Sequence, residues 1–84
     1  MPVDRNGTSL TLGDFVTFEQ ASQGLLRDLP VEDQIAIKAQ IGKRLEIRGF
    51  NDQGNSELEF TDQEGVLHSI WVESSCIVKS NQGQ

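Results

Sequence analysis

The sequence predicts a mainly β fold with one helix, arranged as a small antiparallel barrel of about five strands. The first observation is that three strand-like runs between residues 44 and 73 are separated by two turns of the same kind, Asn51-Asp52-Gln53-Gly54 and Asp62-Gln63-Glu64-Gly65. An Asn or Asp in first place and a Gly in fourth place favours a type I turn closed by a left-handed glycine. The second observation is a helix signal before these runs, which places a helix-containing insert between the first and second strands.

The chain begins with polar residues and reaches its first strand only at the turn signal Gly13-Asp14. Residues 1–11 are rich in Asn, Gly, Thr and Ser, and we expect them to form a flexible N-terminal arm. Residues 12–79 then form a single barrel domain, and residues 80–84 a frayed tail. The first strand is expected at Phe15–Glu19, where aromatic and β-branched residues gather.

The insert carries a helix that we expect to run from Pro30 to Ile41. Proline suits the first turn of a helix because its missing N–H would have no partner there. Gly42 is placed to end the helix. The apolar stripe that faces the sheet is expected to consist of Val31, Ile35 and Ala39, widened by Ile37 and Ile41.

The three runs after the helix alternate between polar and apolar residues, which is typical of half-buried strands. They are Arg44–Arg48, Ser56–Thr61 and Val66–Glu73. The turn at Asp62–Gly65 sets Phe60 opposite His68 and Leu58 opposite Ile70, so apolar residues share one face.

The turn at Asn51–Gly54 sets Arg48 opposite Leu58 and would put a charge on the apolar face. Two arrangements avoid this. An extra residue at Gly49 can form a β-bulge. Alternatively, a loop with an even number of residues pairs Arg48 with Glu59 on the solvent face.

The alternation breaks at Ser74-Ser75-Cys76 before Ile77-Val78-Lys79, which predicts a short helical turn and a closing strand. The layout, from Gly13-Asp14-Phe15-Val16-Thr17-Phe18 to Trp71-Val72-Glu73-Ser74-Ser75-Cys76-Ile77-Val78, resembles the Src-homology-3-like (SH3-like) small barrels. The resemblance covers about residues 12–79 and concerns architecture. The chain has no Tyr and a single Trp, so the resemblance implies no groove for proline-rich peptides. The chain is also similar to small bacterial proteins, a likeness that implies no activity.

Composition narrows the classes of partner. The chain of 84 residues holds 13 Asp and Glu against 7 Lys and Arg, a formal charge of -6. Because nucleic-acid binding depends on basic side chains that neutralise phosphates, we expect no nucleic-acid partner. One cysteine excludes an internal disulfide and fits a reducing compartment. No run approaches the length of a membrane span, so we expect a cytoplasmic protein without a membrane partner.

Four residues are the candidate contacts for a protein partner: Trp71, Leu67, Phe50 and Arg48. Trp71 and Leu67 alternate with His68 along the third run, so they project from the face opposite to it. An exposed Trp beside a Leu is a common anchor of protein interfaces. The alternative is that the insert helix covers this face and makes both residues part of the core.

We expect no catalytic, cofactor-binding or metal-binding residues. Cys76 with His68 and Glu73 would be the set for an enzyme, but a structural histidine and a small buried cysteine explain these residues better. The resulting expectation is a non-enzymatic protein-interaction module, either a monomer or a weak homodimer. The alternative is an acidic inhibitor or immunity-type protein that masks a basic partner surface, with its charge accelerating the encounter.

Overall fold

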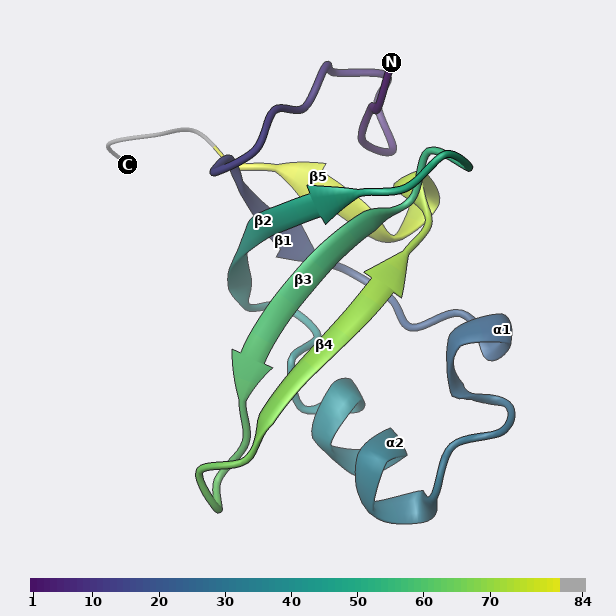
Figure 1. The fold of residues 1–84 in the computed structure, drawn as a ribbon, viewed down its shortest axis with the longest axis vertical. Coiled ribbons are helices and arrows are strands. Elements are labelled where there is room, and N and C mark those ends of the chain that lie inside the picture. The colour runs from purple at the N-terminus through teal and green to yellow at the C-terminus, as the bar shows by residue number, and fades with distance from the viewer. Residues whose placement is uncertain (81–84) are drawn as a thin grey trace.

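The computed structural model describes residues 1–80, which form one antiparallel sheet of five strands with two helices between the first and second strands (Figure 1). The elements in chain order are β1 (Phe15–Phe18), α1 (Gln23–Leu26), α2 (Val31–Lys38), β2 (Arg44–Phe50), β3 (Ser56–Thr61), β4 (Leu67–Val72), the 3₁₀ turn η1 (Ser74–Cys76) and β5 (Ile77–Lys79). The strand order is β4-β3-β2-β1-β5, so β4 and β5 are the two edges. The predicted mainly β architecture with a helix-containing insert is confirmed. Of the tail predicted at residues 80–84, positions 81–84 lie outside the described residues.

Both hairpin turns have the geometry that their sequences predict. In each, the glycine N–H donates to the carbonyl of the first turn residue, at 3.2 Å in Asn51–Gly54 and 3.0 Å in Asp62–Gly65. The two glycines have φ values of 82° and 83°, in the left-handed region that glycine enters at little cost. In the second hairpin Phe60 pairs with His68 and Leu58 with Ile70, as predicted.

The first hairpin contains a β-bulge in β2. Ile47 pairs with Leu58, but the next pair is Gly49 with Glu57, so Arg48 is the extra residue. Arg48 is exposed, and its guanidinium group lies 3.7 Å from the Glu59 carboxylate. The bulge is therefore the arrangement found, and it brings Arg48 to Glu59 on the solvent face as well.

The core is formed by inward-facing residues of all five strands, together with one residue each from α2, η1 and the N-terminal segment. Its members are Leu10, Val16, Phe18, Ile37, Ile47, Leu58, Phe60, Ile70, Val72, Cys76 and Ile77. Three of the four phenylalanines are part of this packing: Phe18 and Phe60 lie in the core, and Phe50 packs against it.

The apolar stripe predicted for the helix is wrong. Val31 and Ile35 are 67% and 64% exposed, whereas Ile37, in the last turn of α2, is 1% exposed. The N–H of Gly42 donates to the Phe18 carbonyl at 2.7 Å and anchors the end of the insert beside β1. This anchor sets the rotation of α2 about its axis, so the face with most apolar residues is not the one turned to the sheet.

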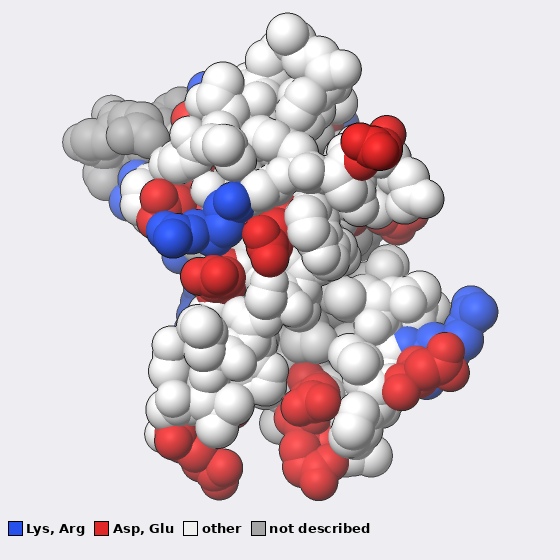
Figure 2. All heavy atoms as spheres, viewed as in Figure 1, with Lys and Arg blue, Asp and Glu red and all other residues white. Residues whose placement is uncertain are grey.

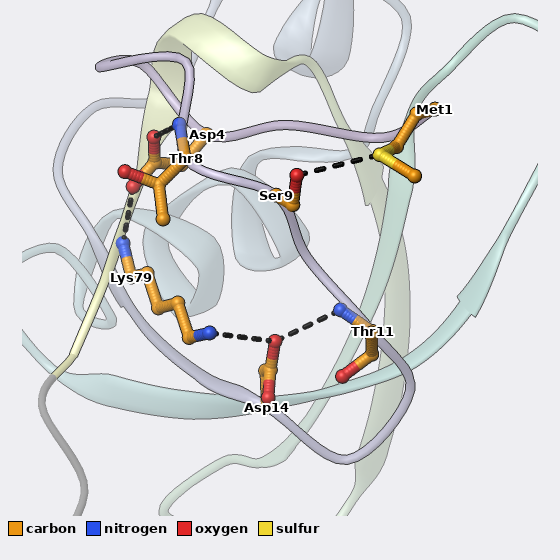
Figure 3. A network of polar contacts seen from close by, with 7 residues as sticks. All are labelled: Met1, Asp4, Thr8, Ser9, Thr11, Asp14 and Lys79. Atoms are coloured by element: carbon orange, nitrogen blue, oxygen red, sulfur yellow. Dashed lines mark hydrogen bonds and ion pairs between the residues drawn. The ribbon is translucent and has the colours of Figure 1, made fainter.

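Within residues 1–11, which the sequence predicts to be a flexible N-terminal arm, Asp4 and Leu10 are buried and the other residues are exposed or partly exposed. Val3 and Ser9 form an antiparallel bridge, and Leu10 belongs to the core. The side chain of Asp4 is the centre of the segment (Figure 3). One of its carboxylate oxygens accepts the N–H groups of Asn6 and Thr8, both at 2.9 Å, and the other accepts the Lys79 N–H at 2.7 Å. The polar composition of the segment therefore marks a tight turn around a carboxylate.

The same segment covers the β5 edge. The Arg5 N–H donates to the Ile77 carbonyl at 2.9 Å, beside the bond from Lys79 to Asp4. The Lys79 ammonium group also lies 3.5 Å from the Asp14 carboxylate (Figure 3). One of the two edges of the sheet is thus occupied by the chain itself.

Candidate functional site

The outward side of β4 carries three exposed side chains, Leu67, Ser69 and Trp71, which we call the β4 face. Leu67 is 64% exposed and Trp71 43% exposed. The residues between them, His68 and Ile70, point to the inner side. Of the two alternatives for Trp71 and Leu67, the exposed one is found, because neither helix covers them.

Trp71 lies across β3 toward a glycine of β2. Glu57 pairs with Trp71 on one side and with Gly49 on the other, so the three residues form one row on the outer face of the sheet. A Cβ atom added to Gly49 would lie 3.7 Å from Cη2 of Trp71 and 2.8 Å from Oε1 of Glu57. The missing side chain at Gly49 therefore leaves room for the indole ring, which is the way aromatic residues cover glycines in sheets.

The other two candidate contacts are separated by the sheet. Arg48 is on the outer side, where its guanidinium group lies 3.5 Å from the carboxylate of Glu46 and 3.7 Å from that of Glu59. Phe50 pairs with Ser56, which is buried, and packs partly buried against the core. The structure therefore brings Arg48 to the same side as the β4 face and places Phe50 on the opposite side.

The backbone of β4 has one free side. The Asp62 N–H donates to the Val66 carbonyl, and pairing continues without a shift from Leu67 to Val72. Since hydrogen-bonded and non-hydrogen-bonded pairs alternate in antiparallel ladders, the N–H and C=O groups of Leu67, Ser69 and Trp71 point away from β3. No backbone group elsewhere in residues 1–80 bonds to them.

A groove of about 450 Å³ lies between this free side and the segment that carries α1. Figure 1 shows α1 beside β4. Leu25 and Leu29 line it from the insert, and Ser69 and Trp71 line it from β4. Glu73 is the one charged residue among the described residues that line it. We call this space the edge groove.

Two glutamates, Glu57 and Glu73, lie beside the β4 face. Glu57 lies next to Trp71 in the sheet and accepts a hydrogen bond from the Ser69 hydroxyl at 2.6 Å. The nearby basic residue, Arg48, is already paired with Glu46 and Glu59. Figure 2 shows red acidic groups at several places on the side of the molecule that it presents, and a blue basic group enclosed by them. The surroundings of the β4 face therefore favour a positively charged contact.

His68 and Cys76 occupy structural positions. The His68 ring stacks on Phe60 with centroids 4.9 Å apart, and its Nε2 lies 2.8 Å from the Asp62 carboxylate. The bond with His68, followed by those from Val66 and Glu64, holds the pKa of the Asp62 carboxyl below its ordinary value. Cys76 is 1% exposed in the core, and a thiol without access to solvent is a poor nucleophile.

Residues that sequence reasoning missed are Gly49, Glu57 and the two leucines of the edge groove, Leu25 and Leu29. A signal for the first two exists. The registers of the two turns, applied together, place Gly49, Glu57 and Trp71 in one row. The leucines carry no such signal, because the sequence does not show where the insert lies relative to β4.

Within residues 1–80, no three or more His, Cys, Asp and Glu side chains gather as they would around a metal ion. No helix of the described part combines the length and the apolar character that crossing a membrane requires. Comparisons with protein-family models, with curated proteins and with solved structures find no match to this chain.

Proposed function

We propose that the protein is a non-enzymatic protein-interaction module whose contact surface is the β4 face. The observation that carries the proposal is Trp71, which stands 43% exposed next to exposed Leu67 on a regular strand. A Trp buries a large area on binding and loses little conformational entropy, so it is enriched among the residues that dominate binding energy.

The way Trp71 is held supports a binding role. Its ring rests toward Gly49 across the row that contains Glu57. A side chain fixed in this way has less freedom to lose when a partner covers it. The surface is therefore organised before the partner arrives.

The architecture that we propose for this module is the SH3-like small barrel. The strand order, in which β5 returns to pair with β1, supports this assignment. The 3₁₀ turn Ser74–Cys76 between β4 and β5 and the helices between β1 and β2 support it as well.

The experiment compares two double variants of the immobilised protein. Leu67→Ser/Trp71→Ala removes the apolar part of the β4 face, and Val31→Ser/Ile35→Ser removes a similar exposed apolar area from α2. Proteins retained from a cell extract are quantified by mass spectrometry. We expect the α2 variant to retain the partner that the unaltered protein retains, and the β4 variant to lose it.

Both variants are checked by thermal unfolding. We expect the substitutions at Leu67, Val31 and Ile35, whose side chains are mostly exposed, to change the stability by about 0.5 kcal/mol or less each. Trp71→Ala should cost about 1–3 kcal/mol, because more than half of this side chain is buried and its ring lies over Gly49. Unfolding of the β4 variant would show that Trp71 and Leu67 act as core residues. A folded β4 variant that keeps the partner would also contradict the proposal.

A second candidate function is an acidic inhibitor or immunity-type protein that masks a basic surface. The observation that favours it is the formal charge of -6 together with Glu46, Glu57 and Glu59 on the outer face of the sheet. Charge of one sign accelerates the encounter with a basic partner and makes it sensitive to salt. The dependence of binding on salt separates the two candidates.

A further inference from the structure

We infer that the edge groove takes an extended, basic segment of a partner protein, which adds to β4 as a further strand. This inference rests on the proposed function and deepens it by naming the chemistry of the partner.

The two edges of the sheet differ in what covers them. At β5, Arg5 donates to the Ile77 carbonyl and Asp4 accepts from the Lys79 N–H, so the chain itself satisfies that edge. At β4, the N–H and C=O groups of Leu67, Ser69 and Trp71 have no backbone partner within residues 1–80. An unpaired row with the spacing of a strand is the template onto which an extended peptide adds.

The shape of the groove limits what fits. Leu25 and Leu29 line it from the insert, opposite Ser69 and Trp71 of β4, and its volume is about 450 Å³. A strand placed there would point alternate side chains toward the leucines and toward the β4 face. The leucines make this wall of the groove apolar, so it favours apolar side chains at the alternate positions of the segment that face it.

Charge decides which side chains the segment carries. Glu73 lines the groove and Glu57 flanks Trp71, while no Lys or Arg lines the groove among the described residues. A Lys or Arg beside Trp71 meets both a carboxylate and the face of an exposed indole, which attracts cations. A second copy of this chain would bring a formal charge of -6 against the same charge. The occupant is therefore a basic segment with apolar residues at alternate positions.

The test uses an acetylated and amidated hexapeptide that alternates lysine and valine. It is titrated into the labelled protein, and binding is followed by amide chemical shifts. We expect shifts at Leu67–Trp71 and at Leu25–Leu29, and none from a peptide in which glutamate replaces lysine. Binding of the glutamate peptide, or shifts confined to other surfaces, would overturn the inference.

Two N-methylated peptides test strand addition itself. One is methylated at the lysine amides and the other at the valine amides, with charge unchanged. Because only alternate residues of an added strand bond to β4, we expect one of the two to lose binding about tenfold or more and the other to bind as before. Equal effects of both would mean electrostatic attachment without strand pairing and would overturn the inference.

Variants of the protein provide an independent test. Ser69→Pro removes an N–H that points to the free side, at an edge position where proline is tolerated, and Ser69→Thr keeps it. We expect about tenfold weaker binding for the first and little change for the second. Unchanged binding by folded Ser69→Pro would contradict the inference, and if that variant does not fold, the N-methylated peptides decide.

The outcomes also separate this inference from the proposed function. If the lysine peptide fails to bind while capture of a partner still depends on Trp71 and Leu67, the strand-addition inference is wrong and the module stands. If the free protein sedimented as a dimer that Ser69→Pro dissociated, a second copy would occupy the groove and the inference would fail.

Discussion

At the scale of single residues, Asp4 shows how one carboxylate can order a polar segment. It is 3% exposed and accepts three backbone N–H groups. Burial acts to raise its pKa, but the bonds from Lys79, Thr8 and Asn6 outweigh burial and lower the pKa below the ordinary value of 3.8. The ionised form is therefore the one that the fold selects.

Replacing Asp4 with Asn is expected to destabilise the protein by about 1–3 kcal/mol at pH 7, since an amide NH₂ would face a backbone donor and leave it unsatisfied. A group with a lowered pKa in the folded state contributes stability above its unfolded pKa and loses it as pH falls through the folded value. The difference between the two proteins should therefore shrink below about pH 3.8. Urea unfolding at pH 7 and at pH 3 measures it.

The control for this substitution is Asp52→Asn, in an exposed turn position. It should change stability by about 0.5 kcal/mol or less. A loss for Asp4→Asn that is equal at both pH values would mean that the residue acts by shape alone and that its ionisation is irrelevant.

Which residues sequence reasoning could find depends on whether their partners are near in sequence. Alternation within β4 places Trp71 on the face opposite to His68, but whether the insert covers that face depends on the tertiary structure, and the sequence left both alternatives open. The burial of Asp4 depends on Lys79, 75 positions away. The sequence contains no local sign of that contact, so the arm at residues 1–11 reads as a polar loop.

At the scale of elements, the two hairpins were the most predictable part of the fold. Turn type follows from four adjacent residues, and so does the register of the second hairpin. For the first hairpin the sequence left two arrangements open, a bulge and an even-numbered loop, and the structure has the bulge. The helix was predictable in its existence and approximate bounds. The buried face of α2 was not predictable, because it depends on tertiary contacts such as the hydrogen bond between Gly42 and Phe18 after the helix.

Gly65→Ala tests the turn at Asp62–Gly65. Gly65 has a φ of 83°, which costs a residue with a Cβ about 1–2 kcal/mol. We expect a loss of about that size in the free energy of unfolding, measured with urea. The matched change is Gly24→Ala in α1, where no atom lies within 4 Å of the added Cβ.

Gly24→Ala is expected to leave stability unchanged or raise it by up to about 1 kcal/mol, because alanine is the better helix former. The informative quantity is the difference between the changes in unfolding free energy that Gly65→Ala and Gly24→Ala cause. If Gly65→Ala were as harmless as Gly24→Ala, the turn would tolerate another geometry, and the register that places Trp71 opposite Glu57 would lose its support.

At the scale of the whole molecule, the two edges of the sheet differ in what covers them. The N-terminal segment satisfies β5, whereas the free side of β4 borders the edge groove, which the insert lines from its other side. Because the chain itself covers the β5 edge, the β4 edge is the one to which an added strand could bond. If an extended segment adds to β4 as we propose, the acidic surroundings would favour a basic one.

Salt dependence is the prediction that belongs to this scale. Trp71 is the single Trp of the chain, so its fluorescence reports binding of the lysine–valine peptide directly. The screening length falls from about 10 Å at 0.1 M salt to about 3 Å at 1 M, while backbone bonds and apolar contacts are not screened. We expect the affinity to fall several-fold over this range and then to level off. Glu57→Gln/Glu73→Gln should reduce the fall, and Glu32→Gln, at the start of α2, should not. A decline that continues steeply without levelling would favour the acidic inhibitor, whose binding depends on charge alone.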